Sequence, residues 1–348
     1  MQMIDIVNSN KREGDIMYLL RKLLNPTIYQ GKYKRKNYFE GWYFKIIDVS
    51  KKHVLAVIPG ISYDEHKKDC HAFVQVIDAY TCKVEYFRYP LSLFRFNERQ
   101  FEIEVGDNYF SNKKIVLDLG SVDDKINGVL HFESIVPYPR KILQPGIMGP
   151  FSFMPFMECY HGIVNIHHEI SGTLNKAGNV LDFTNGYGYI EKDWGKSFPE
   201  AWIWMQCNHF DTQDVSLMFS VAKIPWMSRH FIGFLCFLRI QDTLFLFTTY
   251  TNAKIHQLTH KEDTLTVILK DKKFKLEFTA EHADTGTLKA PKNGLMHREI
   301  EESITALVSV TLLDNEDNII YEGEGTNVGL ETVNEKILLA ELNKKNRH

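Results

Sequence analysis

The chain of 348 residues has few cysteines and no long apolar run, and both features narrow its class. Its five cysteines include no CxxC pair, and this odd, scattered set predicts reduced thiols in a cytoplasmic protein. The N-terminal residues MQMIDIVNSNKREGD are charged and lack the apolar region of a secretory signal. No window reaches the roughly 18 apolar residues of a membrane-spanning helix. We therefore expect a soluble, cytoplasmic protein.

Basic charge and the common nucleotide and hydrolase motifs are also lacking. The net charge of -3 argues against a nucleic-acid partner, because such proteins are normally basic. A dinucleotide GxGxxG, a Walker loop, HExxH and GxSxG are all missing. Hydrophobic residues make up 44% of the chain and aromatic residues 13%, so sizeable cores and aromatic-lined surfaces can form. Nothing in the sequence indicates the oligomeric state.

One short helix is predicted near the N-terminus. Residues 15–24, DIMYLLRKLL, place apolar side chains at helical spacing, and Asn25-Pro26 ends the run. The helix could pack against the body of the protein or contact a membrane surface. Because it has ten residues and few basic charges, packing is the favoured interpretation, and peripheral membrane contact stays open.

From Lys36 onward the pattern changes to short strands separated by turns. The strands recur about every ten residues, which is typical of an antiparallel barrel or sandwich. Residues 135–160 interrupt them with five of the eleven prolines. So dense a proline run excludes a regular element, and its Phe and Met content is unlike a solvated linker. We favour a plug over the mouth of a cavity, with an interdomain linker as the alternative.

The most unusual stretch is GYGYIEKDWGKSFPEAWIWMQCNHF, residues 186–210. At strand spacing, one side of its first half carries Tyr187, Tyr189, Glu191 and Asp193. After a break at Gly195 and Pro199, a second run places Trp202, Trp204, Gln206 and Asn208 on one side, and Ile203, Met205 and Cys207 on the other. Carboxylates and amides thus share a face with large aromatic rings. Since burying an unpaired carboxylate is costly, this pattern indicates either a satisfied structural network or a lined pocket.

Histidines provide little support for a metal site. His167 and His168 are neighbours and point to opposite faces of a strand. His161 with Glu158 falls short of the four ligands of a closed zinc site. We therefore predict no metal.

Five segments of the chain resemble the tocopherol cyclase family. They are FEGWYFK, MGPFSFMPFMECYHGIV, the central stretch above, TGTLKAPKNGL and EGEGTNVGLE, and the resemblance as a whole runs from about Gly31 to Glu331. The family pattern usually has Asn where this chain has Asp193, so the centre of the motif gains a carboxylate. The family is broad, and membership alone does not establish the reaction.

The resemblance implies an all-β fold of two tandem lipocalin-like (calycin-type) antiparallel β-barrels, a fold shared with carotenoid 1,2-hydratases. With the predicted helix, this gives an N-terminal extension at 1–30, a first barrel at 31–180 that includes the proline-rich plug at 135–158, and a second barrel at 181–340. Small barrels of this kind can hold one apolar ligand.

The resemblance also implies an isomerase (intramolecular lyase) activity on a prenylated quinol or related isoprenoid lipid. An acid protonates the alkene and a phenol oxygen, or water in a hydratase, captures the cation, with no cofactor and no metal. The acid is a carboxyl group kept protonated by an apolar site, and aromatic faces stabilise the cation.

We expect Asp193 or Glu191 to be the acid. Trp194, Trp202 and Trp204 would line the pocket or stabilise the cation, and Gln206 and Asn208 would orient the phenol. Further candidates for substrate binding share faces with these residues: they are Tyr187, Tyr189, Glu40, Trp42, Glu158 and His161. For these residues a structural role, such as a salt bridge, core packing or a satisfied amide, is the alternative interpretation.

Two other functions explain the same aromatic residues. A lipocalin-like carrier would bind a hydrophobic ligand without chemistry, and would not need a carboxylate near an alkene. A structural or interaction protein with filled barrels would have no cavity at all.

Overall fold

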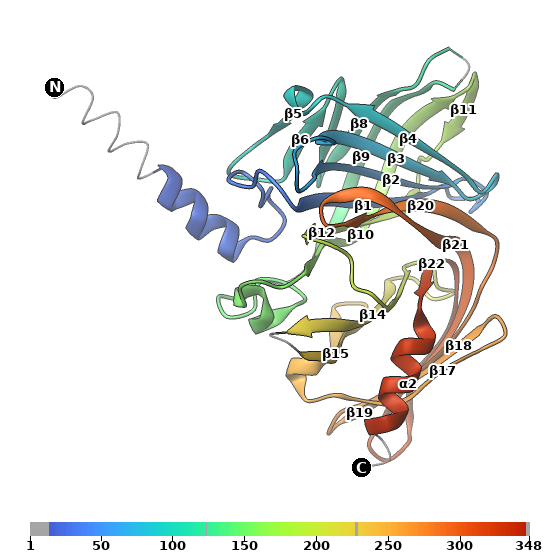
Figure 1. Ribbon diagram of the computed structural model, residues 1–348. Helices are drawn as coiled ribbons and strands as arrows, with labels where there is room; N and C mark the ends of the chain where they lie inside the picture. The colour runs from blue at the N-terminus through green and yellow to red at the C-terminus, as the bar shows by residue number, and fades with distance from the viewer. Residues whose placement is uncertain (1–13, 123, 227–228, 346–348) are drawn as a thin grey trace.

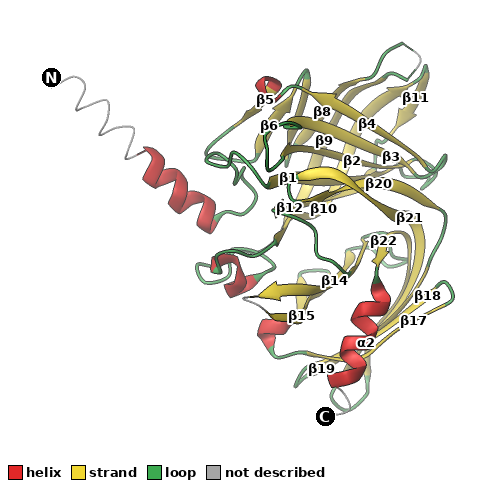
Figure 2. Cartoon of the chain, in the orientation of Figure 1, coloured by secondary structure: helices red, strands yellow, loops and turns green. Residues whose placement is uncertain are grey.

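A computed structural model describes residues 14–122, 124–226 and 229–345. The described chain forms two large antiparallel sheets, one above the other in Figure 1, joined by loops and flanked by two helices (Figure 2). The predicted all-β architecture is confirmed. Residues 1–13, on which the argument against a signal sequence rested, and residues 346–348 lie outside the described residues.

The first sheet runs in the order β4-β3-β2-β1-β12-β10-β9-β8-β7-β6-β5, and β11 pairs with β10. Its strands are β1 (Tyr38–Ile47), β2 (Val54–Tyr63), β3 (His71–Asp78), β4 (Lys83–Tyr89), β5 (Phe94–Phe96), β6 (Glu102–Val105), β7 (Asn108–Ser111), β8 (Lys114–Leu119), β9 (Ile126–Pro137), β10 (Cys159–Lys176), β11 (Asn179–Asp182) and β12 (Gly186–Gly195). Tight turns follow the local sequence. Ala177 and Gly178, with φ of 49° and 84°, form the two-residue loop between β10 and β11, as expected of a hairpin turn with both central residues left-handed.

The second sheet runs in the order β16-β15-β14-β13-β22-β21-β19-β18-β17, and β20 pairs with β21. Its strands are β13 (Trp202–Cys207), β14 (Val215–Trp226), β15 (Arg229–Ile240), β16 (Thr243–Thr248), β17 (Lys254–Lys261), β18 (Thr264–Lys270), β19 (Phe274–Glu281), β20 (Thr285–Lys292), β21 (Leu295–Asp314) and β22 (Ile319–Val333). Short 3-10 turns lie at η1 (Leu91–Leu93), η2 (Gly149–Phe153) and η3 (Thr249–Thr251).

The division between the sheets lies between Gly195 and Trp202, later than the division at 180/181 expected from the sequence. Strand β12 pairs with β1 on one side and with β10 on the other, so it is an inner strand of the first sheet. The break at Gly195 and Pro199, which splits the central stretch in two, is therefore where the chain crosses from one sheet to the other. Sequence periodicity identifies strands but not their partners, which explains the misplaced boundary.

Each sheet curls around its own apolar core. The first core contains residues such as Phe44, Val74 and Ile103, and the second contains Ile203, Met205 and Phe278. A third cluster lies between the sheets and includes Tyr43, Tyr189, Trp202 and Trp204. The alternation predicted for the second half of the central stretch is thus confirmed, since odd and even residues of β13 enter different clusters. Because both faces of β13 are buried, its sequence is apolar on both sides.

The two helices differ from the sequence-based expectations. Residues 14–24 are helical, as predicted, but the helix projects from the sheets in Figure 1 and does not pack its leucines on the body. The helix α2 (Glu335–Lys345) follows the last strand and packs Leu338 on the second core, and its first half lies in the segment assigned to the second barrel at 181–340. No helix in the described part of the chain has the length and apolar character needed to span a bilayer.

Candidate functional site

A cluster of acidic side chains lies between the two sheets. The register of β1, β12 and β10 pairs Gly41 with Asp193, Tyr43 with Glu191, and His161 with Asp193. These residues therefore share the face of the first sheet that is turned toward the second sheet. Of the four residues predicted to share one side of an extended strand, Tyr189, Glu191 and Asp193 lie at this cluster, whereas Tyr187 lines a separate cavity.

His161 connects the two predicted acids. Its Nδ1 lies 2.9 Å from Asp193 Oδ1, and its Nε2 lies 3.7 Å from Glu191 Oε2. Glu191 is buried, and its Oε2 accepts hydrogen bonds from the Tyr189 hydroxyl at 2.6 Å and from Trp204 Nε1 at 3.1 Å. Asp193 is the more exposed of the two, with 23% of its side chain accessible. The two acids thus have different environments.

The second sheet adds two further glutamates that the sequence analysis did not identify. Glu331 on β22 pairs with Trp204 on β13 and with Glu302 on β21. The Trp202 Nε1 donates to Glu331 Oε2 at 2.5 Å, and the Tyr43 hydroxyl donates to Glu302 Oε1 at 2.5 Å. Glu302 Oε2 has no hydrogen-bond partner among the described residues.

Burial keeps protons on this cluster. Burial raises the pKa of Glu191 to about 7, with Asp193 adding to the increase and His161 opposing it. Burial likewise raises the pKa of Glu331 to about 8, and raises that of Glu302 well above its usual value, with the neighbouring Glu331 adding to the effect. Three crowded carboxyl groups out of contact with water cannot all be ionised, so at neutral pH part of the cluster is protonated.

His161 is the cation of the site. Burial alone would lower the pKa of His161, but the carboxylates of Asp193 and Glu191 outweigh burial and raise it to about 9. At neutral pH the imidazole is therefore protonated and paired with Asp193. A carboxyl group with a pKa near 7 is a stronger acid than this imidazolium, so the glutamates are the better proton donors at this site.

Two cavities border the acidic cluster. One, of about 120 Å³, is lined by Glu191, Asp193, His161 and Glu331 together with aromatic and methionine side chains, which are Met148, Phe151, Met157, Phe198, Trp202, Trp204, Phe231 and Phe234. The other, of about 70 Å³, lies on the Tyr43 and Glu302 side and shares Glu191, Asp193 and Glu331. The acidic groups therefore line apolar cavities in the interface between the two sheets. The expected fold had suggested a ligand site inside a barrel. The core residues of each sheet occupy its interior.

The proline-rich loop closes one side of the larger cavity. Met148, Phe151 and Met157 line the cavity, and the Tyr250 hydroxyl donates to the Ile147 carbonyl at 2.8 Å. This is the position expected for a plug. A structural protein with filled barrels would have no cavity, so the presence of this cavity argues against that alternative.

Three groups of the site could also ligate a metal ion. One ligand atom each of His161, Glu191 and Asp193 lies within 4.8 Å of the other two. In the arrangement described above, His161 already binds Asp193, and Glu191 Oε2 already accepts two hydrogen bonds. The protein groups thus satisfy each other in the geometry observed.

Several predicted site residues lie outside these cavities. Tyr189 sits behind Glu191 and holds it by its hydroxyl. Gln206 is buried next to Lys45, which donates to the Gln206 carbonyl at 3.1 Å. Tyr187 and Asn208 line a separate polar cavity of about 150 Å³ near His209. Glu191, Asp193, His161, Trp202 and Trp204 are the predicted residues that the fold brings together around the larger cavity.

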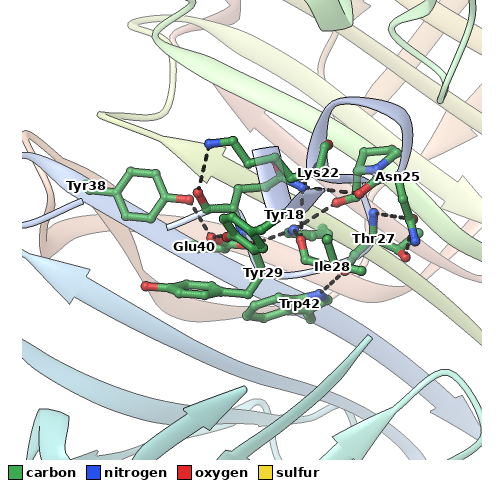
Figure 3. A network of polar contacts seen from close by, with 12 residues as sticks. Tyr18, Lys22, Asn25, Thr27, Ile28, Tyr29, Tyr38, Glu40 and Trp42 are labelled. Atoms are coloured by element: carbon green, nitrogen blue, oxygen red, sulfur yellow. Dashed lines mark hydrogen bonds and ion pairs between the residues drawn. The ribbon is translucent and has the colours of Figure 1, made fainter. Parts of the chain in front are cut away.

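Glu40 and Trp42 point to the opposite face of β1 and fasten the N-terminal segment. Glu40 pairs with Lys192 at 2.6 Å, with both side chains inaccessible, and accepts the Gln30 backbone N–H (2.9 Å) and the Tyr38 hydroxyl. Figure 3 shows this network, with the Trp42 Nε1 donating to the Thr27 carbonyl. The role is structural, because every group satisfies another part of the chain.

Trp194 and Glu158 border a different hollow. Trp194 stacks on Tyr160 with ring centroids 5.4 Å apart, and Lys192 lies 4.7 Å from its ring. Glu158 lines the same hollow as Trp194, and burial raises its pKa. Both residues flank the larger cavity without lining it.

The residues missed in the sequence left recognisable signals. Glu331 is the last residue of the segment EGEGTNVGLE, and Tyr43 lies within FEGWYFK. Glu302 alternates with Ile300 and Ile304, so an acid interrupts an apolar face of β21. An acid within an apolar period-two face is the pattern that already singled out Glu191, and it could have identified Glu302 as well.

The geometry defines a class of protein: two lipocalin-like sheets with an acidic, aromatic-lined site between them. The family model described as tocopherol cyclase-like matches residues 121–333, and the chain belongs to this family. It is 34% identical over 67 residues to "Probable tocopherol cyclase, chloroplastic" of Oryza sativa subsp. japonica, covering 19% of this chain and 14% of that protein. It is 34% identical over 70 residues to "Tocopherol cyclase, chloroplastic" of Zea mays, covering 20% and 15%. The matched stretches thus span about a seventh of these relatives.

Solved structures share the fold across most of the chain. The crystal structure of CghA with Sch210972 has a TM-score of 0.54 and 9% identity, and the match covers 85% of this chain and 88% of that one. Kievitone hydratase from Nectria haematococca has a TM-score of 0.49 and 11% identity, covering 88% and 93%. At the identity of the CghA match, the likeness shows the fold alone.

Proposed function

We propose that this protein catalyses the acid-promoted cyclisation, or hydration, of a prenylated quinol or related isoprenoid lipid. A protonated glutamate, Glu191 or Glu331, gives its proton to a trisubstituted alkene, and a tertiary cation forms. The phenol oxygen of the same molecule attacks the cation, and its proton returns to the carboxylate. The product is an isomer of the substrate. If water attacks instead, the product is the hydrated lipid, and the proton balance is the same.

The observation that carries this proposal is the crowding of Glu191, Glu302 and Glu331 against apolar space. A carboxyl group held neutral at pH 7 is what alkene protonation requires. The Trp202 and Trp204 rings line the same cavity and can stabilise a nearby cation. One face of Trp202 already contacts the Arg298 guanidinium, 4.7 Å from the ring, so Trp204 is the better placed of the two.

Within this mechanism the two predicted acids have separate roles. Glu191 is a candidate donor, together with Glu331, because burial raises its pKa. Asp193 pairs with His161 and fixes the imidazolium beside Glu191. Asp193 is therefore a positioning residue whose replacement acts through His161.

Single substitutions test the proposal. Turnover of a prenylated hydroquinone would be measured for Glu191→Gln and Glu331→Gln, with binding of the same compound followed by tryptophan fluorescence. We expect turnover to fall roughly 10²- to 10⁴-fold in the donor variant while binding is retained. Asp211→Asn, on the exposed loop after β13, is the matched control and should retain full turnover. Full turnover in both Gln variants would overturn the proposal, and binding without turnover in the unmodified protein would favour a carrier.

A further inference from the structure

The N-terminal helix carries an apolar surface that the body of the protein leaves open. Within residues 14–24, only Tyr18 is buried, with its hydroxyl donating to the Tyr29 carbonyl at 2.6 Å. The other large apolar side chains of the helix are 44% to 58% exposed; they are Ile16, Met17, Leu19, Leu20, Leu23 and Leu24. Isolated exposed apolar residues are common on protein surfaces, but six of them on one short helix form a continuous patch of the kind that marks an interaction site.

The proline-rich loop extends this surface toward the candidate active site. Phe156 in this loop is 95% exposed, and a hollow of about 800 Å³ is lined both by the loop and by the end of the helix. Leu23, Phe156 and Trp226 border the hollow from the helix, the loop and the β14–β15 hairpin. We call the six helix residues, Phe156 and the lining of this hollow the docking surface.

The docking surface is basic although the chain as a whole is acidic. Lys22, Lys34, Lys196 and Arg229 line the hollow, against the single acid Glu158, whereas the net charge of the chain is -3. Exposed apolar side chains beside clustered bases are the chemistry that binds an anionic lipid surface. A second copy of the chain is disfavoured as the occupant, because a two-fold contact would bring the same bases together.

The hollow also adjoins the larger cavity. Met157 lines both spaces, so a flexible side chain borders the hollow on one side and the cavity of the acidic cluster on the other. The cavity of about 120 Å³ beside Glu191 is smaller than the roughly 150 Å³ of a cavity that binds benzene, so it is too small for a long isoprenoid tail. A tail would therefore extend past Met157 into the hollow.

We propose that the docking surface binds an anionic membrane, and that the lipid substrate enters from the bilayer through the hollow, past Met157, with its ring reaching Glu191. The entry route rests on the proposed function, whereas membrane binding does not. The helix lies in the interface with its leucines in the acyl region, and Phe156 inserts beside it.

Vesicle co-sedimentation of the full chain tests membrane binding. The vesicles would be phosphatidylcholine alone, or equal parts of phosphatidylcholine and phosphatidylglycerol. We expect binding to the anionic vesicles to be at least about tenfold tighter. Leu20→Glu should weaken that binding about tenfold or more, and Lys34→Glu with Arg229→Glu should remove most of the preference for anionic lipid.

Matched controls are available on distant exposed positions. Val180→Glu on β11 introduces the same charge at a side chain that is 69% exposed, and Lys272→Glu reverses an exposed charge in the turn before β19. Both should bind vesicles like the unmodified chain, and thermal unfolding would check that every variant is folded. No vesicle binding by the unmodified chain, or equal effects of Leu20→Glu and Val180→Glu, would overturn the proposal. A dimer in light scattering that Leu20→Glu dissociates, without vesicle binding, would assign the surface to a second copy.

Two readouts separate this proposal from the proposed function. Glu191→Gln should bind vesicles normally while losing turnover. Leu20→Glu should turn over a short-chain, water-soluble prenyl hydroquinone normally but lose turnover of a long-chain substrate presented in anionic vesicles. Equal loss on both substrates would overturn the entry route, and an inactive unmodified chain that still binds vesicles would leave membrane binding standing alone.

Discussion

The two faces of the β1–β12 strand pair bury acids in opposite ways. On the inner face, Glu40 has Lys192, a tyrosine hydroxyl and a backbone N–H as partners. On the outer face, Glu191 lies with Glu302 and Glu331, and His161 is the cation next to it. Consecutive residues of one strand thus enter a satisfied ion pair and an acid-rich site. Burial of a carboxyl group is therefore no sign of function by itself; crowding with other acids against apolar space is the distinguishing feature.

Breaking the inner pair should have the largest effect on stability. Glu40→Gln leaves the Lys192 ammonium buried without a counter-charge, which costs about 3–5 kcal/mol of the free energy of unfolding. Chemical denaturation would measure this loss. The double variant Glu40→Gln, Lys192→Met should recover part of it, because the unpaired charge is gone. A loss below about 1 kcal/mol in the single variant would contradict the structural role of Glu40.

The outer cluster should make turnover depend on pH in a defined direction. Burial raises the pKa of Glu191 to about 7 and that of Glu331 to about 8, so the donor loses its proton as pH rises through this range. Turnover should be highest below about pH 7 and fall roughly tenfold per unit above about pH 8. A pH–rate profile of the short-chain substrate measures the alkaline limb. A rate that rises with pH across this window would indicate a base and exclude the proposed donor.

Removing one acid from the outer cluster should stabilise the protein, whereas removing Glu40 from its pair with Lys192 should destabilise it. The raised pKa of Glu302 means that its ionisation opposes folding, so this cost is absent at low pH and grows as pH rises. Glu302→Gln removes the titrating group and should increase the free energy of unfolding by about 1–2 kcal/mol near pH 9, with little change near pH 5. Urea denaturation at the two pH values would show the difference. Destabilisation at both would place Glu302 with Glu40 as a structural acid.

The smallest change sharpens the assignment of the donor. Trp204→Phe removes the N–H that donates to Glu191 Oε2 at 3.1 Å and keeps an aromatic ring in place. Because this hydrogen bond favours the carboxylate, its loss should raise the pKa of Glu191 and shift the alkaline limb upward by a few tenths of a pH unit. Trp202→Phe is the matched change at Glu331. If Trp204→Phe shifts the alkaline limb of the pH–rate profile, Glu191 is the donor. If Trp202→Phe shifts it, Glu331 is the donor.

The all-β class, the short helix and the side of the strand on which Glu191 and Asp193 lie could all be predicted from local sequence patterns. Period-two alternation and turn signals are local, so the sequence shows them directly. The same locality explains the identification of Trp202 and Trp204 as residues that share a face. The resemblance to the family supplied the two-sheet fold, and the match over residues 121–333 supports it.

The packing of the two sheets, which local patterns do not show, sets which strand faces meet. Glu331 and Glu302 come from strands more than 100 residues after Glu191, and strand pairing across the second sheet brings them to the interface between the two sheets. The pairing of β12 with β1 likewise placed the sheet boundary and sent Glu40 and Trp42 to the opposite face. Exposure of the N-terminal leucines was also undecidable from periodicity, because an apolar stripe looks the same whether it meets a core or a membrane. Contacts between distant segments fix these features, and they depend on the register and packing of whole sheets.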